Sequence, residues 1–134
     1  MAGYAVDIEK ATLDNTYFRK VLFTGPKSQL VLMTLKPGED IGKETHDDID
    51  QFVRVEAGTG KAVIDGKEHA LKDGSAVVIP AGSEHNVINT SSNEPLKLYT
   101  IYTPPEHPDG TVHKTKAEAD ADHHHPSAAL ATKT

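Results

Sequence analysis

The sequence predicts an all-β protein, a single small sandwich or barrel. Along its middle, short apolar runs of strand length are separated by turn residues about every eight to twelve positions, which is typical of this class. The dipeptide Asp65-Gly66 lies between two such runs and is a strong signal for a two-residue hairpin. No sustained helical period is present, apart from a weak alanine-rich stretch near residues 116–121. A chain of 134 residues has room for one domain with its own core.

The strands are expected mainly within residues 29–103, which we assign to the barrel. Residues 29–36 are almost continuously apolar and end at Pro37-Gly38, which indicates a strand buried on both faces. Residues 50–56 alternate, so that Gln51, Val53 and Val55 share one face while Arg54 points the other way. Further strands are predicted at residues 61–64, 67–71, 76–79, 85–89 and 96–102.

The two ends of the chain differ from this pattern. Residues 1–28 contain strand-like pieces at 6–8 and 17–23, which we expect to join the barrel or to extend the sheet of a partner in a homodimer. Residues 104–119 form a Pro/Gly-rich segment, and residues 120–134 are expected to be disordered. In the Pro/Gly-rich segment, His107 and His113 fit a surface loop better than a lid or subunit contact. The triplet His123, His124 and His125 in the tail is not expected to form a defined site.

Composition excludes some partners. The formal net charge is −6, with 14 Lys and Arg against 20 Asp and Glu, so the chain has no basic surface suited to nucleic acid. The sequence has no cysteine, so any metal must be held by nitrogen and oxygen ligands. Neither a secretory signal nor a run of membrane-spanning length is apparent, and we expect a soluble cytoplasmic protein that does not bind membranes.

Two segments carry side chains able to hold a metal. In the first, Glu44 and His46 are two residues apart and would point to the same side of a strand, and Gln51 follows. In the second, the turn at Pro80-Ala81-Gly82 leads into a strand that begins near His85. We therefore predict that Glu44, His46, Gln51 and His85 meet in one metal site.

These two segments resemble the paired motifs of the cupin superfamily. The second motif matches throughout, at Gly74, Pro80, Gly82, His85 and Asn89. The first matches at His46 and Gly58, but Glu44 stands where the family usually has a histidine and Gln51 where it has a glutamate. The resemblance covers about residues 30–103 and implies a single-domain jelly-roll β-barrel. The ending at residues 102–110 is similar to that of small cupins labelled mannose-6-phosphate isomerase-like.

The substituted ligand set keeps the net charge of the usual one, because the single carboxylate is at position 44 and no longer at position 51. Two histidines and a carboxylate match the facial triad, which leaves coordination positions open for substrate or oxygen. We expect a divalent ion, manganese, iron or zinc. The alternative is a barrel that has lost its metal and keeps His46 and His85 as interior polar groups. A buried carboxylate without a cation is costly, which favours the metal.

The resemblance implies a protein that acts on a small polar molecule. The leading expectation is a sugar-phosphate isomerase in which the metal acts as a Lewis acid. A non-haem-iron-type dioxygenase and a non-enzymatic cupin that binds a sugar or other small molecule remain alternatives. No general base is identified, because Glu44 would be occupied by the metal. The candidate substrate contacts are Lys43, Arg54 and one of Tyr99 and Tyr102, whichever faces inward.

Overall fold

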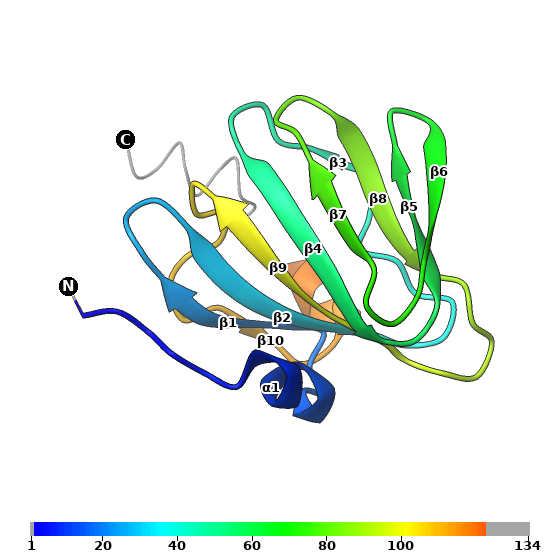
Figure 1. Cartoon of the computed structure of the whole chain (residues 1–134), viewed down its shortest axis with the longest axis horizontal. Helices are drawn as coiled ribbons and strands as arrows, with labels where there is room; N and C mark the ends of the chain where they lie inside the picture. The colour runs from blue at the N-terminus through cyan, green and yellow to red at the C-terminus, as the bar shows by residue number, and fades with distance from the viewer. Residues whose placement is uncertain (1, 123–134) are drawn as a thin grey trace.

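Two antiparallel sheets face each other in the computed structural model, which describes residues 2–122 (Figure 1). The larger sheet contains, in spatial order, β10 (Val112–His113), β1 (Arg19–Thr24), β2 (Gln29–Leu35), β9 (Leu96–Thr103), β4 (Asp50–Ala57) and β7 (Ala76–Ile79). The smaller sheet contains β3 (Glu44–Thr45), β8 (Glu84–Asn89), β5 (Gly60–Ile64) and β6 (Lys67–Leu71). Helices α1 (Ile8–Asp14) and α2 (Lys116–Ala121) are short. The predicted all-β fold is confirmed.

The core lies between the sheets because apolar residues alternate along the central strands. On β4, Gln51, Val53 and Val55 are buried, whereas Phe52 and Arg54 are partly exposed, as the sequence predicts. Strand β9 alternates in the same way, and β2 is almost wholly buried. This alternation sends every second residue of the central strands into the barrel, where the candidate site lies.

The hairpin between β5 and β6 forms at the predicted dipeptide. Asp65 has φ of 48° and Gly66 has φ of 82°, the left-handed pair that a two-residue type I′ turn requires. At the other end of β5, the backbone of β8 passes very close to Gly60. A Cβ atom on Gly60 would lie 2.5 Å from the carbonyl oxygen of Ile88. Glycine therefore permits the close approach of β5 to the strand that carries His85.

The predicted strand at residues 6–8 is wrong. Asp7 is instead the N-cap of α1, and its side chain accepts a hydrogen bond from the backbone N–H of Lys10 at 3.2 Å. The predicted strand near residues 17–23 is present as β1, but it lies between β2 and β10. Because β10 pairs only with Arg19 and Lys20, it covers one part of the edge of β1, and the homodimer stays a prediction.

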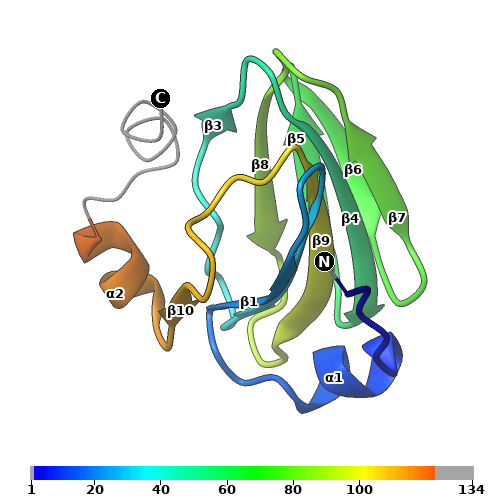
Figure 2. The ribbon, with the colours of Figure 1, turned by 90° about the vertical axis from the view of Figure 1, so that its left-hand side faces the viewer.

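The C-terminal segment packs against the barrel (Figure 2). His107 and His113 are 5% and 8% exposed, so the expected surface loop is wrong. The two histidines are buried because buried side chains of β1 and β2 form hydrogen bonds with them. Helix α2 extends to Ala121, so the tail predicted to be disordered from residue 120 begins in a helix. Residues 123–134, including the histidine triplet, lie outside the described residues. Within residues 2–122, no helix is long and apolar enough to span a membrane.

Candidate metal centre

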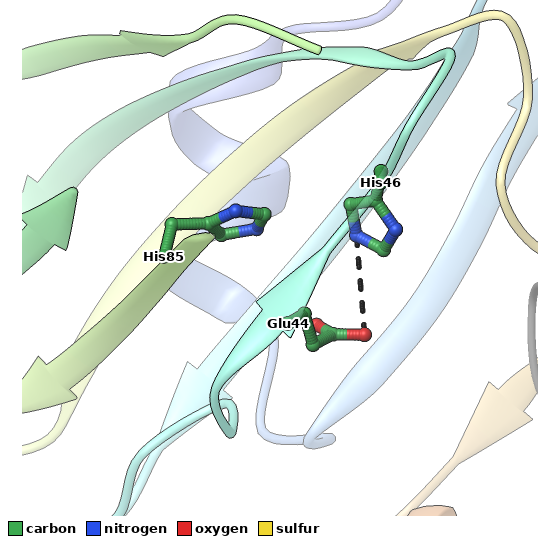
Figure 3. A group of neighbouring side chains, drawn as sticks. All are labelled: Glu44, His46 and His85. Atoms are coloured by element: carbon green, nitrogen blue, oxygen red, sulfur yellow. Dashed lines mark ion pairs between the residues drawn. The ribbon is translucent and has the colours of Figure 1, made fainter. Parts of the chain in front are cut away.

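The three strongest predicted ligands converge inside the barrel. Strand β3 pairs with β8 in a register that sets Glu44 directly opposite His85. His46 follows two residues after Glu44, immediately beyond the end of β3. One ligand atom from each of Glu44, His46 and His85 lies within 4.8 Å of the other two (Figure 3). Two short segments about forty residues apart thus supply a carboxylate and two imidazoles to one point.

The ring of His85 is oriented by its own turn. Burial alternates along β8, and His85 is 5% exposed on the inner face. Its Nδ1 lies 3.0 Å from the carbonyl oxygen of Ser83. In the tautomer that carries the proton on Nδ1, this nitrogen donates to that carbonyl, and Nε2 is the ligating atom. A hydrogen bond of this kind from the second ring nitrogen is characteristic of metal-binding histidines.

His46 lies between two carboxylates. Its Nε2 is 3.9 Å from Oε2 of Glu44, and its Nδ1 is 3.1 Å from Oε2 of Glu106. The rings of His46 and His85 are 5.2 Å apart between centroids. The backbone carbonyl of His46 accepts a hydrogen bond from Gly82 at 2.8 Å, which ties the end of β3 to the turn before β8. The Pro80–Gly82 turn thus helps to hold both histidines together.

Glu106 is a part of the site that sequence reasoning missed. Its side chain is 1% exposed, although it comes from a Pro/Gly-rich segment expected on the surface. The pair with Nδ1 of His46 is within ion-pair distance, but neither carboxylate oxygen has a hydrogen bond of regular geometry among the described residues. The sequence signal was the similarity of residues 102–110 to other small cupins, which indicated the segment but not this side chain.

Burial is the main electrostatic influence on the two acidic groups beside the histidines, Glu106 and Tyr102. Burial, with a smaller contribution from the charge of Glu44, raises the pKa of Glu106 to about 8 against the opposing charge of Arg19. Burial, the largest cause, also raises the pKa of Tyr102 well above its usual value, with smaller contributions from Glu44 and Glu106. A cation at the convergence point would offset this charge. The donor set of two nitrogens and one oxygen therefore fits a divalent ion.

Gln51, the fourth predicted ligand, faces the barrel interior. It is 3% exposed, and its Nε2 donates to Oγ1 of Thr100 at 3.0 Å. Its Oε1 is buried without a hydrogen-bond partner among the described residues. Gln51 also pairs with Tyr102 across β4 and β9, and the Tyr102 ring lies 6.3 Å from that of His46. An unsatisfied amide oxygen there is compatible with ligation, which stays a prediction.

The candidate substrate contacts on β4 and β9 differ in the face of the strand on which they lie. Tyr102 faces inward at 2% exposure and makes edge-on contacts with the rings of His46 and His107. Tyr99 lies on the opposite face of β9 and contacts Phe52. Arg54 also points outward, as predicted, and forms an ion pair with Glu56 at 3.6 Å. Tyr102 is therefore the inward-facing tyrosine that the sequence left open.

Two facing antiparallel sheets that enclose a histidine and carboxylate cluster define a cupin-type barrel with a candidate metal centre. The sequence model of the family described as "Cupin domain" matches residues 31–102. The chain belongs to this family. The comparisons support the assignment to a small single-domain cupin but not to the mannose-6-phosphate isomerase-like subgroup.

Two curated relatives are similar over most of the chain, and both are described as uncharacterized. YrkC of Bacillus subtilis (strain 168) is 52% identical over 124 residues, which cover 88% of this chain and 66% of that protein. L612 of Acanthamoeba polyphaga mimivirus is 50% identical over 113 residues, which cover 81% of this chain and 70% of that protein. The chain thus spans just under two thirds of the length of YrkC.

Among solved structures, BH2720 from Bacillus halodurans matches with a TM-score of 0.88 and 47% identity, covering 90% of this chain and 96% of that one. A predicted oxalate decarboxylase from Thermotoga maritima matches with a TM-score of 0.56 and 24% identity, covering 59% of this chain and 69% of that one. The second match supports the fold alone.

Proposed function

We propose that this cupin binds a divalent cation through Glu44, His46 and His85 and acts on a small polar molecule. The observation that carries the proposal is the convergence of these three groups within 4.8 Å inside the barrel. Buried carboxylates and imidazoles at one point are costly without a compensating cation. The contact of each Nδ1, with Ser83 or Glu106, is the arrangement expected when Nε2 binds metal.

The leading reaction is isomerisation of a sugar or sugar phosphate. A bound cation would supply Lewis-acid polarisation of a substrate oxygen. The protein must also move a proton, and Glu106 is a buried carboxylate beside His46 that lies outside the three-ligand set. It is therefore the described residue best placed to hold that proton at a carboxylate oxygen. The buried rings of Tyr102 and His107 pack edge to face and limit the access of water.

A second candidate is dioxygen chemistry, which the composition of the cluster favours. Two histidines and one carboxylate are the ligand set of non-haem iron oxygenases. The two reactions differ in their need for oxygen. Turnover that continues under strict anaerobiosis with iron-free, zinc- or manganese-loaded protein supports isomerisation, whereas turnover only with ferrous ion and oxygen supports the second candidate. A ligand that raises the melting temperature but is never turned over would indicate a binding protein.

Metal content tests the shared part of the proposal. We expect protein purified without added metal, or titrated with Zn²⁺ or Mn²⁺, to hold close to one ion per chain. The variants Glu44→Ala and His85→Ala should lose most of it. Glu84→Ala is the matched control, because Glu84 is adjacent to His85 but its side chain is 58% exposed. Equal metal content in the wild type and Glu44→Ala would remove Glu44 from the site.

A further inference from the structure

We propose that Arg19 forms an anion-binding subsite in the barrel interior, so that the substrate is a small molecule bearing a carboxylate or a phosphate. The inference rests on the proposed function, because the proposed metal site would bind the other end of the substrate. It defines the substrate class that this site would take: an oxyanion at Arg19 and a hydroxyl or carbonyl oxygen toward the histidines.

Strand parity places Arg19 inside the barrel. Arg19 and Val21 of β1 are buried, at 8% and 7% exposed, and Lys20 between them is exposed. Val21 belongs to the hydrophobic core, so its face of the strand is the inner one. Arg19 is also directly opposite Met33 of β2, which is fully buried. The guanidinium is thus enclosed among core residues.

The partners of Arg19 leave its charge without a direct counter-ion. One terminal nitrogen lies 3.2 Å from Nδ1 of His113, and the guanidinium carbon lies 5.3 Å from the centroid of the Phe18 ring. Among the described residues, the buried Nε has no hydrogen-bond partner. Within residues 2–122, no carboxylate lies within 4.0 Å of Arg19. A buried cation without a counter-ion is costly. The chain has a net charge of −6, so acidic residues able to pair with a cation are abundant in it.

His113 orients the guanidinium. Its Nε2 lies 2.7 Å from the carboxylate of Asp122, the C-cap of α2. In the tautomer that carries the proton on Nε2, His113 donates to Asp122 and accepts from Arg19. The imidazole of His113 therefore separates the carboxylate of Asp122 from Arg19. It fixes the guanidinium, and Asp122 does not neutralise the charge by direct contact. The arginine fork is well suited to bind a carboxylate or phosphate through two hydrogen bonds.

The charge of Arg19 acts on the same interior as the candidate metal centre. His113, the partner of Arg19, belongs to the same C-terminal segment as His107, and the ring of His107 lies 5.3 Å from that of Tyr102 between centroids. The ring of Tyr102 lies 6.3 Å from that of His46, and Glu106 is 3.1 Å from Nδ1 of His46. A small substrate with polar groups at both ends would thus find a cation at each end, the bound metal and Arg19.

Three-carbon probes test the subsite: glycerol, glycerate and glycerol 3-phosphate. Calorimetric titration of zinc-loaded protein should give tighter binding of at least one anion than of neutral glycerol, and the two anions separate carboxylate from phosphate recognition. Arg19→Met should weaken that anion about 10- to 100-fold, the loss expected for charge-assisted hydrogen bonds. Arg54→Met is the matched control, because Arg54 points outward from β4 with a side chain 39% exposed, and it should bind like the wild type. Both variants should still bind zinc, which separates loss of the anion from loss of the metal.

Two results would each overturn the subsite. One is an anion affinity of Arg19→Met that equals that of the wild type while the variant still binds zinc. The other is a wild type that binds neither anion more tightly than glycerol. If Arg19→Met does not fold, Arg19→Lys keeps the charge but not the fork and should show an intermediate loss. A wild type that binds no zinc would contradict the proposed function instead. Binding of inorganic phosphate to metal-free wild type and Arg19 variants would then still decide the subsite.

Discussion

Gln29 and His107 are joined by two hydrogen bonds across 78 residues of sequence. The Nε2 of Gln29 donates to the carbonyl of His107 at 2.7 Å, and the N–H of His107 donates to Oε1 of Gln29 at 2.9 Å. The same Oε1 also accepts from the N–H of Glu106 at 3.1 Å. One buried side chain of β2 therefore fixes the backbone of the segment that brings Glu106 to His46.

We expect Gln29→Leu to destabilise the protein by about 2–4 kcal/mol, because it leaves buried backbone groups of Glu106 and His107 without partners. Chemical denaturation monitored by circular dichroism measures the free energy of unfolding. Thr24→Ala is the control, since it removes only the bond at 2.9 Å that Gln29 donates to Thr24, and should cost about 1 kcal/mol or less. A Gln29→Leu variant no less stable than Thr24→Ala would contradict this role.

The sequence was sufficient to predict the barrel strands and the convergence of Glu44, His46 and His85. Alternation of two residues placed Gln51 and Val53 inward, and the spacing of Glu44 and His46 placed both near His85. The register of the β3–β8 pairing sets Glu44 opposite His85. The inward faces follow from strand geometry, whereas the meeting of Glu44 with His85 depends on the pairing of two strands about forty residues apart.

Residues 104–122 were harder to predict because their placement depends on partners far away in the sequence. Glu106 lies in a Pro-rich stretch whose composition is typical of a surface loop. It is buried because its backbone N–H donates to Gln29 and its carboxylate pairs with His46. His113 is buried because it pairs with Arg19, 94 residues earlier. The start of α1 was misread because the capping role of Asp7 competes with a short apolar alternation.

Asp40 links α2 to the four-stranded sheet and should contribute pH-dependent stability. Its carboxylate accepts from Nδ2 of Asn86 at 2.9 Å and from Nζ of Lys116 at 3.0 Å. The hydrogen bond from Asn86 and the nearby charge of Lys116 lower the pKa of Asp40 below its usual 3.8. A lowered folded-state pKa means that this stabilisation is present above the usual value and is lost as pH falls through the folded value.

We therefore expect Asp40→Asn to lower the free energy of unfolding at pH 7 by about 0.5–1 kcal/mol, a modest value because the pair is partly exposed. The difference from the wild type should shrink as the pH falls below 4. Urea denaturation at pH 7, 5 and 3.5 measures it. Asp14→Asn is the control, since Asp14 pairs with Lys10 on the exposed side of α1, with side chains 64% and 71% exposed. A pH-independent difference would rule out this contribution of Asp40.

Gly60 tests the close packing of β5 against β8. A Cβ atom there would lie 2.5 Å from the carbonyl oxygen of Ile88 and 2.9 Å from Cδ2 of Leu96, so the backbone must shift. We expect Gly60→Ala to cost about 2–4 kcal/mol. Gly66→Ala is the comparison, because Gly66 has open space around it and only its φ of 82° resists a side chain, which costs about 1 kcal/mol. Thermal or urea unfolding that ranks Gly66→Ala as the more damaging change would refute the close approach.

Glu106 should control how tightly the barrel holds a metal without being one of the ligands. Its carboxylate is 3.1 Å from Nδ1 of His46, and partners of this kind fix the ring and strengthen the ligating nitrogen. Glu106→Gln keeps the size of the side chain but removes the charge, and we expect Zn²⁺ or Co²⁺ affinity to fall about 10- to 100-fold, the usual effect of losing such a partner. Glu68→Gln, at a position whose side chain is 63% exposed, should leave that affinity unchanged.

Calorimetric titration gives the affinity, and the visible spectrum of the cobalt form reports the ligand geometry. A spectrum that changes in intensity or position in Glu106→Gln, with the free energy of unfolding of the metal-free protein close to that of the wild type, identifies a positioning role rather than loss of fold. Gln29→Leu should shift the cobalt spectrum in the same direction, because it releases the segment that holds Glu106 in place. Unchanged affinity and spectrum in Glu106→Gln would mean that His46 binds the ion without help from this carboxylate.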